Sequence, residues 1–426
     1  MNPVPELLAP AGNFEKLKAA LRFGADAVYL AGKAFGMRSA ADNFDDDELR
    51  SAVQYAHHMG KKVYLTVNTM PRAHEYAPLR EFLMRVGIPA GSDSVPDAMI
   101  VADLGVMTMV RELLPQMEIH VSTQAGICSP ATAKAFVALG AKRLVLAREL
   151  NLEEIRLIRV ALPDEIELEA FVHGSMCVSY SGRCMLSNEL TGRDGNRGMC
   201  AQPCRWNYTL VEEKRPDVPL PIETSNLGTF ILSSKDMCMI EHIPALMESG
   251  ISSFKIEGRM KSAYYAAVVS NTYRMAMDAY VRDGEQYAYD PRWYEELQSV
   301  SHREYCTGYF LDDCRENSQL ASSVGYLREK AYFATALEYD KDALPAALPA
   351  VTEHGVLALF GQKNKISIGD AAEFLTPGEI GKAFTVTELY SEDGEPIPSA
   401  PHPHQRFFAR IPFPVTPGDI LRAGRE

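Results

Sequence analysis

The sequence predicts an α/β protein built on an eight-stranded (β/α)8 barrel of the TIM type, followed by a small antiparallel β-barrel domain. Two observations lead to this prediction. Short apolar strands alternate with amphipathic helices through the first two-thirds of the chain, and shorter alternating runs separated by Gly and Pro turns fill the last quarter. Alternating strands and helices form parallel βα units, and eight such units can close into a barrel.

Eight apolar segments are predicted to be the barrel strands. They are residues 6–9, 27–30, 63–67, 98–101, 119–122, 144–146, 168–172 and 254–256. Asn13, Asn43 and Asn151 each precede a predicted helix, and asparagine is a good residue to cap a helix N-terminus. A strongly apolar helix from residue 261 to about 281 is predicted to close the barrel.

The chain of 426 residues is too long for one ordinary compact core, so more than one domain is expected. We assign residues 1–285 to the barrel, including a cysteine-rich insertion at 173–230. Residues 286–322 are predicted to be a helical linker, and residues 323–426 the small β domain. Long insertions inside a compact domain are usually functional, so the insertion is the first place to look for a site.

Composition limits the classes of function. Hydrophobic residues make up 46% of the chain and charged residues 23%, with no apolar run long enough to span a membrane. We therefore expect a cytoplasmic protein with no membrane partner. The net charge of -13 argues against indiscriminate binding to nucleic acid, which needs clustered Lys and Arg. Between residues 177 and 215, however, six basic residues face four acidic ones, which allows a local anionic partner.

The cysteines give the strongest chemical signal. Four of the eight, Cys177, Cys184, Cys200 and Cys204, follow the pattern C-x6-C-x15-C-x3-C just after the seventh predicted strand. Structural zinc sites usually pair cysteines two to four residues apart, and the first interval here is wider. Four thiolates with nearby glycines suit an iron-sulfur cluster. A zinc knot, or four buried cysteines without a metal, remains the alternative interpretation.

Polar side chains follow the other predicted strands, at the end where such barrels carry their active sites. They are Asn68, Ser122, Gln124, Arg148, Glu149, Glu169, His173, Lys255, Glu257 and Arg259. Arginines that converge on a pocket can bind a carboxylate by bidentate contacts. His173, four residues before Cys177, could act as a general acid or base or as a hydrogen-bond donor to a neighbour. Each residue alone is compatible with a surface ion pair, but together they indicate a functional site.

Several phrases of the sequence resemble the collagenase-like proteins of peptidase family U32. They are residues 6–12 (ELLAPAG), 24–29 (GADAVY), 120–124 (HVSTQ), 171–174 (FVHG), the four-cysteine motif, and 253–262 (SFKIEGRMKS). Within that family the sequence is most similar to the bacterial prephenate-dependent tRNA uridine hydroxylases, which install 5-hydroxyuridine at the wobble position.

The resemblance implies a 4Fe-4S cluster on the four cysteines, prephenate as a co-substrate and tRNA as the partner. Barrel position and resemblance together assign carboxylate binding to Arg148, Lys255 and Arg259. They assign further substrate contacts to Asn68 and Gln124, and the chemistry to His173 and Glu257. Two alternatives stay open: a collagenase-like peptidase, although no G-x-S-x-G or H-E-x-x-H motif is present, and an iron-sulfur factor that binds tRNA or assists assembly.

Overall fold

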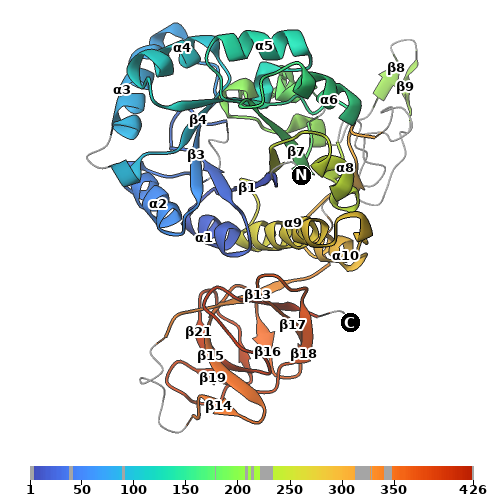
Figure 1. Cartoon of the computed structure of the whole chain (residues 1–426). Helices are drawn as coiled ribbons and strands as arrows, with labels where there is room; N and C mark the ends of the chain where they lie inside the picture. The colour runs from blue at the N-terminus through green and yellow to red at the C-terminus, as the bar shows by residue number, and fades with distance from the viewer. Residues whose placement is uncertain are drawn as a thin grey trace.

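Within the described part of the chain, eight parallel strands close into a barrel ringed by helices (Figure 1). The computed structural model describes residues 4–37, 42–88, 92–177, 179–206, 210–212, 215–220, 234–311, 327, 329–339 and 348–424. The barrel strands are β1 (Glu6–Pro10), β2 (Ala27–Leu30), β3 (Lys62–Val67), β4 (Ala98–Val101), β5 (Glu118–Val121), β6 (Arg143–Val145), β7 (Glu167–Ser175) and β11 (Ser253–Ile256). Because β11 pairs with both β1 and β7, the ring is closed, and the predicted barrel is confirmed.

Helices cover the outside of the barrel. They are α1 (Phe14–Arg22), α2 (Asp46–His58), α3 (Tyr76–Gly87), α4 (Leu104–Leu113), α5 (Pro130–Ala138), α6 (Leu152–Val160), α8 (Ile243–Met247) and α9 (Ala263–Asp283). Asn13 and Asn151 cap α1 and α6, as predicted. The predicted cap at Asn43 is wrong. Asp45 caps α2 and forms a capping box with Glu48, and Asn43 lies two residues earlier with a φ of 52°.

The connection from β7 to β11 contains the additional elements. They are α7 (Leu186–Thr191), β8 (Leu210–Glu212), β9 (Arg215–Leu220) and β10 (Asp236–Cys238). β10 lies antiparallel to the end of β7 and pairs on its other side with β12 (Tyr305–Cys306). β7 itself continues to Ser175, so the predicted insertion at 173–230 begins inside a barrel strand. Residues 221–233 and 312–326, which include the ends predicted for the insertion and the linker, lie outside the described residues.

The C-terminal domain is antiparallel, as predicted, and lies beside α9 and α10 (Arg292–Gln298) in Figure 1. Its strands are β13 (Tyr332–Ala336), β14 (Val351–Thr352), β15 (Gly355–Gln362), β16 (Ile366–Ser367), β17 (Ala371–Leu375), β18 (Lys382–Thr385), β19 (Leu389–Ser391), β20 (Ser399–Ala400), β21 (Arg406–Ile411) and β22 (Ile420–Ala423). Its long pair of strands, β15 and β21, buries a separate core that includes Phe360 and Phe407.

The two domains meet through buried polar contacts. The guanidinium of Arg422 on β22 reaches Glu296 on α10, and Asn271 on α9 donates to the carbonyl of Glu379. Much of α9 is therefore buried on more than one side, which explains why its sequence is apolar over most of its length. Among the described residues, the search for a helix long and apolar enough to cross a membrane finds none.

Candidate functional site

A cavity of about 200 Å³ lies at the carboxyl end of the barrel strands. Residues at or just beyond the ends of β3, β5, β6, β7 and β11 line it, and the cysteine segment, defined here as Cys177 with residues 179–206, contributes the remaining wall. Pockets for drug-sized ligands measure roughly 300–1,000 Å³, so this cavity suits a smaller organic group. The carboxyl end is also the face on which barrels of this type carry their active sites.

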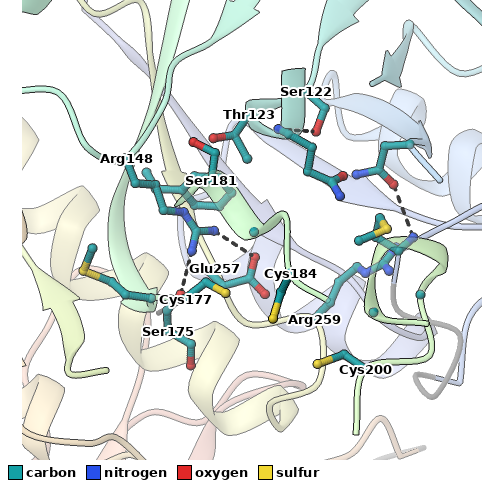
Figure 2. A pocket seen from close by; sticks show the side chains of 18 of the residues that line it. Ser122, Thr123, Arg148, Ser175, Cys177, Ser181, Cys184, Cys200, Glu257 and Arg259 are labelled. Atoms are coloured by element: carbon teal, nitrogen blue, oxygen red, sulfur yellow. Dashed lines mark hydrogen bonds and ion pairs between the residues drawn. The ribbon is translucent and has the colours of Figure 1, made fainter. Parts of the chain in front are cut away.

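The structure brings together most of the predicted site residues. Those that line the cavity are Asn68, Ser122, Gln124, Arg148, Cys177, Cys184, Cys200, Cys204, Lys255, Glu257 and Arg259. Figure 2 shows the guanidinium groups of Arg148 and Arg259 and the thiols of Cys184 and Cys200 arranged around it. Residues more than 190 positions apart therefore form one site, because the ends of parallel strands meet at one face.

Three predicted residues, Glu149, Glu169 and His173, do not line the cavity, and of these only His173 was expected to take part in the chemistry. A register shift between Lys255 and Ile256 places Ile256 opposite His173, and the imidazole packs among Tyr265, Tyr273 and Tyr305 with 1% of the residue exposed. Burial lowers the pKa of His173 to about 3, even though Asp236 opposes the shift. The imidazole is therefore neutral near pH 7 and does not line the cavity, so the predicted role of His173 in the chemistry is wrong.

Arg148 is held in a fixed orientation. Its guanidinium lies 3.9 Å from the centre of the Phe171 ring and donates to the carbonyl of Ser175 at 2.9 Å. A second nitrogen lies 3.8 Å from Glu257 Oε2, while Nε is buried without a hydrogen-bond partner among the described residues. A stacked arginine with an unused donor is well suited to bind an anion. Figure 2 shows this arginine and Glu257 facing each other.

Arg259 approaches the cavity from the segment after β11. Its Nη1 donates to Thr66 Oγ1 at 3.0 Å, and the residue is buried. Asn68, after β3, accepts the backbone N–H of Met37 at 3.2 Å and so fixes the loop after β2. Thr66 was not predicted to belong to the site, because a threonine inside an apolar strand carries no signal that separates it from packing residues.

Lys255 is already paired inside the barrel. Its Nζ lies 2.6 Å from Glu169 Oε1, and Arg143 contacts the other oxygen of that carboxylate at 3.1 Å. Burial alone would raise the pKa of Glu169, but Lys255 and Arg143 outweigh it and hold the pKa below its ordinary value. Lys255 therefore contributes less net charge to a bound anion than the sequence suggested, and the two arginines are the stronger candidates.

Several interactions hold the cysteine segment over the barrel. Glu149, after β6, accepts both the N–H and the hydroxyl of Ser181, at 2.6 and 2.8 Å. Arg183 donates to the carbonyl of Gln124 at 2.6 Å. Arg197 forms two bonds of 2.6 Å to the carboxylate of Glu75, which lies after β3. These partners lie 32 to 122 residues apart in the chain, so no local sequence pattern could have predicted them.

The four thiols form a donor set that fits an iron-sulfur cluster. The backbone N–H of Leu186 donates to Cys184 Sγ, and that of Gln202 to Cys200 Sγ, each at 3.3 Å, and such bonds are typical of cluster ligands. Burial raises the pKa of Cys204. Arg205 opposes this rise, and the three other cysteines add to it. A raised pKa favours the protonated thiol, so a bound metal would have to displace that proton to gain Cys204 as a ligand.

The spacing of the sulfurs bears on the zinc alternative. Within the part of the chain that the structure describes, no three Cys, His, Asp or Glu side chains are gathered closely enough to hold a single metal ion. A zinc knot would place four ligands around one ion, whereas a cuboidal cluster would bind each cysteine to a different iron atom.

Comparison with known families shows which protein family the chain belongs to. Residues 12–320 match peptidase family U32, and residues 348–422 match the U32 C-terminal domain. The chain belongs to peptidase family U32. The first matched region spans the barrel, and the second lies within the C-terminal domain.

Three U32 relatives carry different names. A Bacillus subtilis protein called "tRNA hydroxylation protein P1" is 36% identical over 99% of this chain and 95% of its own length. A Porphyromonas gingivalis protein called "Collagenase" is 34% identical over 78% of this chain and 80% of its own. An Escherichia coli "23S rRNA 5-hydroxycytidine C2501 synthase" is 37% identical over 65% of this chain and 40% of its own.

The cavity of this U32 protein contains hydroxyl and thiol side chains that bear on the peptidase alternative. Its described lining includes serine, threonine and cysteine side chains but no histidine. Ser181 donates its hydroxyl to Glu149, and Glu257 faces Arg148. A hydrolytic nucleophile needs an adjacent base or a metal-bound water, and among the described lining residues no histidine supplies that base.

We expect Arg197→Met to loosen the cysteine segment. The change removes two hydrogen bonds to Glu75, a pair that is about one-quarter exposed, so the expected loss is about 1 kcal/mol, or roughly a fivefold change in local opening. Native-state hydrogen exchange of residues 193–200 should accelerate by that factor, whereas Arg193→Met should leave it unchanged. Equal exchange in both variants would show that the pair does not hold the segment.

Proposed function

We propose that this chain is an RNA-modifying enzyme that hydroxylates C5 of the wobble uridine in tRNA, with a 4Fe-4S cluster and prephenate as co-substrate. The observation that carries the proposal is one cavity in which four cysteines and three arginines, Arg148, Arg205 and Arg259, meet. The relatives named for tRNA hydroxylation and for 5-hydroxycytidine synthesis support the type of reaction. The tRNA relative matches 99% of the chain and the rRNA relative 65%, which favours tRNA as the substrate.

Cys177, Cys184, Cys200 and Cys204 would hold the cluster. When bound, the cluster supplies one-electron chemistry, which is a sensible companion for the oxidation of an uncharged pyrimidine. The chain's own contribution is to fix the sulfurs. The contacts of Ser181 with Glu149 and of Arg197 with Glu75 set the position of the segment on both sides of Cys184.

Arg148 and Arg259 would bind the two carboxylates of prephenate. Both guanidinium groups are oriented before any ligand arrives, Arg148 by Phe171 and Ser175, and Arg259 by Thr66. A donor array that is already fixed loses less conformational entropy on binding. Glu257, across from Arg148, limits the positive charge of the cavity, so that a small diacid is favoured over a long polyanion.

The outer surface of the cysteine segment suits RNA. Six large apolar side chains at the segment and next to it are between 41% and 62% exposed: Tyr180, Met185, Leu190, Met199, Trp206 and Met260. Arg183 and Arg193 are exposed on the same segment. Exposed aromatic side chains stack on unpaired bases, and arginines contact phosphates, so this surface favours a single-stranded loop over a duplex.

Two measurements test the proposal. Mass spectrometry of tRNA nucleosides from a strain lacking the gene should show loss of 5-hydroxyuridine, and the wild-type gene should restore it. Anaerobically purified protein should contain about four iron atoms per chain. Unchanged tRNA together with cleavage of gelatin would support the peptidase that the Porphyromonas name suggests. Bound iron with unchanged tRNA and no cleavage would point to a binding or assembly factor instead.

Arg148→Met should separate co-substrate binding from RNA binding. Methionine keeps the packing on Phe171 but removes the charge-assisted hydrogen bonds, so we expect the KM for prephenate to rise by about tenfold or more. The KM for tRNA should stay within about twofold. Arg156→Met, on the exposed face of α6, is the matched control and should change neither value. A rise in both KM values for Arg148→Met would contradict the assignment.

A further inference from the structure

Gln124 contributes a buried side-chain amide to the wall of the cavity. It lies in the 3-10 turn Thr123–Ala125 after β5, lines the cavity and is 5% exposed. Among the described residues, neither Oε1 nor Nε2 of its amide has a hydrogen-bond partner. Buried amides are nearly always paired because leaving one unpaired is costly, so an unpaired one at a cavity wall indicates a ligand.

The backbone around Gln124 is fixed, which gives its amide a defined position. Its carbonyl accepts from Arg183 at 2.6 Å, and its N–H donates to Ser122 Oγ at 3.5 Å. Thr123, which precedes it, donates its hydroxyl to the carbonyl of Leu146 at 2.9 Å. Ser122 and Thr123 lie at the edge of the cavity in Figure 2. The turn is thus held from three directions while the side-chain amide is left unused.

The chemistry of the unused group selects its ligand. A carboxamide presents one acceptor and two donors, and a ligand that satisfies both ends must offer a donor next to an acceptor. A carboxylate offers only acceptors and would leave Oε1 unpaired. The edge of a pyrimidine base offers both kinds of group side by side. Three other polar side chains of the cavity do not offer a free donor and acceptor together. Asn68 Oδ1 accepts the N–H of Met37, and the guanidinium groups of Arg148 and Arg259 can only donate.

We propose that Gln124 binds the hydrogen-bonding edge of a pyrimidine that has left its RNA strand and entered the cavity. This inference rests on the proposed function and assigns the base-reading contact within the same site. An enzyme that reacts at C5 must have the base outside its stack, and the unpaired bases of a loop make this easier. The arginines then bind the acid, and the amide binds the neutral base.

Fluorescence anisotropy with two RNA stem-loops tests the assignment on the full chain purified without air. The loops are identical except that one carries uridine at the wobble position and the other an abasic site. Wild-type protein should bind the uridine loop about tenfold more tightly, within the range for a bidentate hydrogen-bonded pair. Gln124→Met, which keeps the side chain's length but removes both polar atoms, should abolish this preference. Its affinity for the abasic loop should not change, which also shows that the variant folds.

A matched control is available in the other domain. Gln362 on β15 is 2% exposed and also has an unpaired Oε1, so Gln362→Met makes the same change away from the cavity and should keep the tenfold preference. If Gln124→Met keeps the preference but weakens prephenate binding, the amide binds the acid and the inference is overturned. If wild-type protein shows no preference for uridine, the proposed function itself fails. If the wild type prefers uridine and Gln124→Met keeps this preference with normal prephenate binding, the inference about Gln124 is overturned and the proposed function stands.

Discussion

Cys184→Ala should remove both the bound iron and the 5-hydroxyuridine of the tRNA. Cys184 lines the cavity and accepts an N–H···S bond from Leu186, so its thiolate would be one of the four cluster ligands. Loss of a group that merely orients a metal ligand costs roughly 10–100-fold in affinity or activity, and loss of a ligand itself should cost more. We therefore expect activity to fall by more than about 100-fold, measured by nucleoside mass spectrometry, with iron measured on the same protein.

The control for this prediction is another cysteine of the same chain. Cys128 is exposed and does not line the cavity, so Cys128→Ala should keep both iron and activity. Iron retained at wild-type levels in Cys184→Ala would show that the four thiols do not act as one ligand set. Loss of hydroxyuridine with full iron content would instead give Cys184 a role in the reaction that is separate from holding the cluster.

The barrel could be predicted because its signal is local and repeated. Each strand is a short apolar run, each helix has an amphipathic pattern, and both repeat eight times. The site could be predicted in part for the same reason: once the strands are known, the residues that follow them must meet at one face. Arg148 follows β6, Glu257 and Arg259 follow β11, and all three line the cavity as predicted.

His173 shows where the argument fails. Side chains alternate along a regular strand, so His173 should point to the same side as Phe171. The register shift near Ile256 changes this alternation, and Gly174 has a φ of 102°. A Cβ at Gly174 would also collide with the carbonyl of Glu257. Such irregularities depend on contacts between distant segments, and no periodic pattern in the sequence reveals them.

The cysteine segment shows a second limit. Its spacing predicted a common ligand set, and all four cysteines do line one cavity. The interactions that hold the segment in place, such as the ion pair of Arg197 with Glu75, join residues that lie far apart in the sequence. The positive charges of Lys255 and Arg143 are evident from the sequence. Their pairing with the carboxylate of Glu169 could not be predicted from it. Charge that looked available for a ligand is in part already neutralised.

Arg422→Met should destabilise the protein by about 3–5 kcal/mol, the usual cost of removing one partner from a buried ion network. Arg422 is 0% exposed between the domains, where its guanidinium contacts Glu296 at 2.6 Å and Glu373 at 2.7 Å. The variant would leave these buried carboxylates with fewer partners. Chemical denaturation followed by circular dichroism should show the loss. Arg406→Met is the matched control, because its ion pair with Glu392 is about half exposed and should contribute little.

The same network predicts how stability depends on pH. Burial would raise the pKa of Glu373, but Arg422 and Lys330 outweigh it and hold the pKa below its ordinary value of 4.5. A carboxylate with a lowered pKa stabilises the folded state above its ordinary pKa, and this stability is lost as the pH falls through the lowered folded value. The stability difference between wild type and Arg422→Met should therefore be full at pH 7 and shrink below about pH 4.5. A difference that stays constant down to pH 3 would mean that Arg422 stabilises the interface by packing, not by its charge.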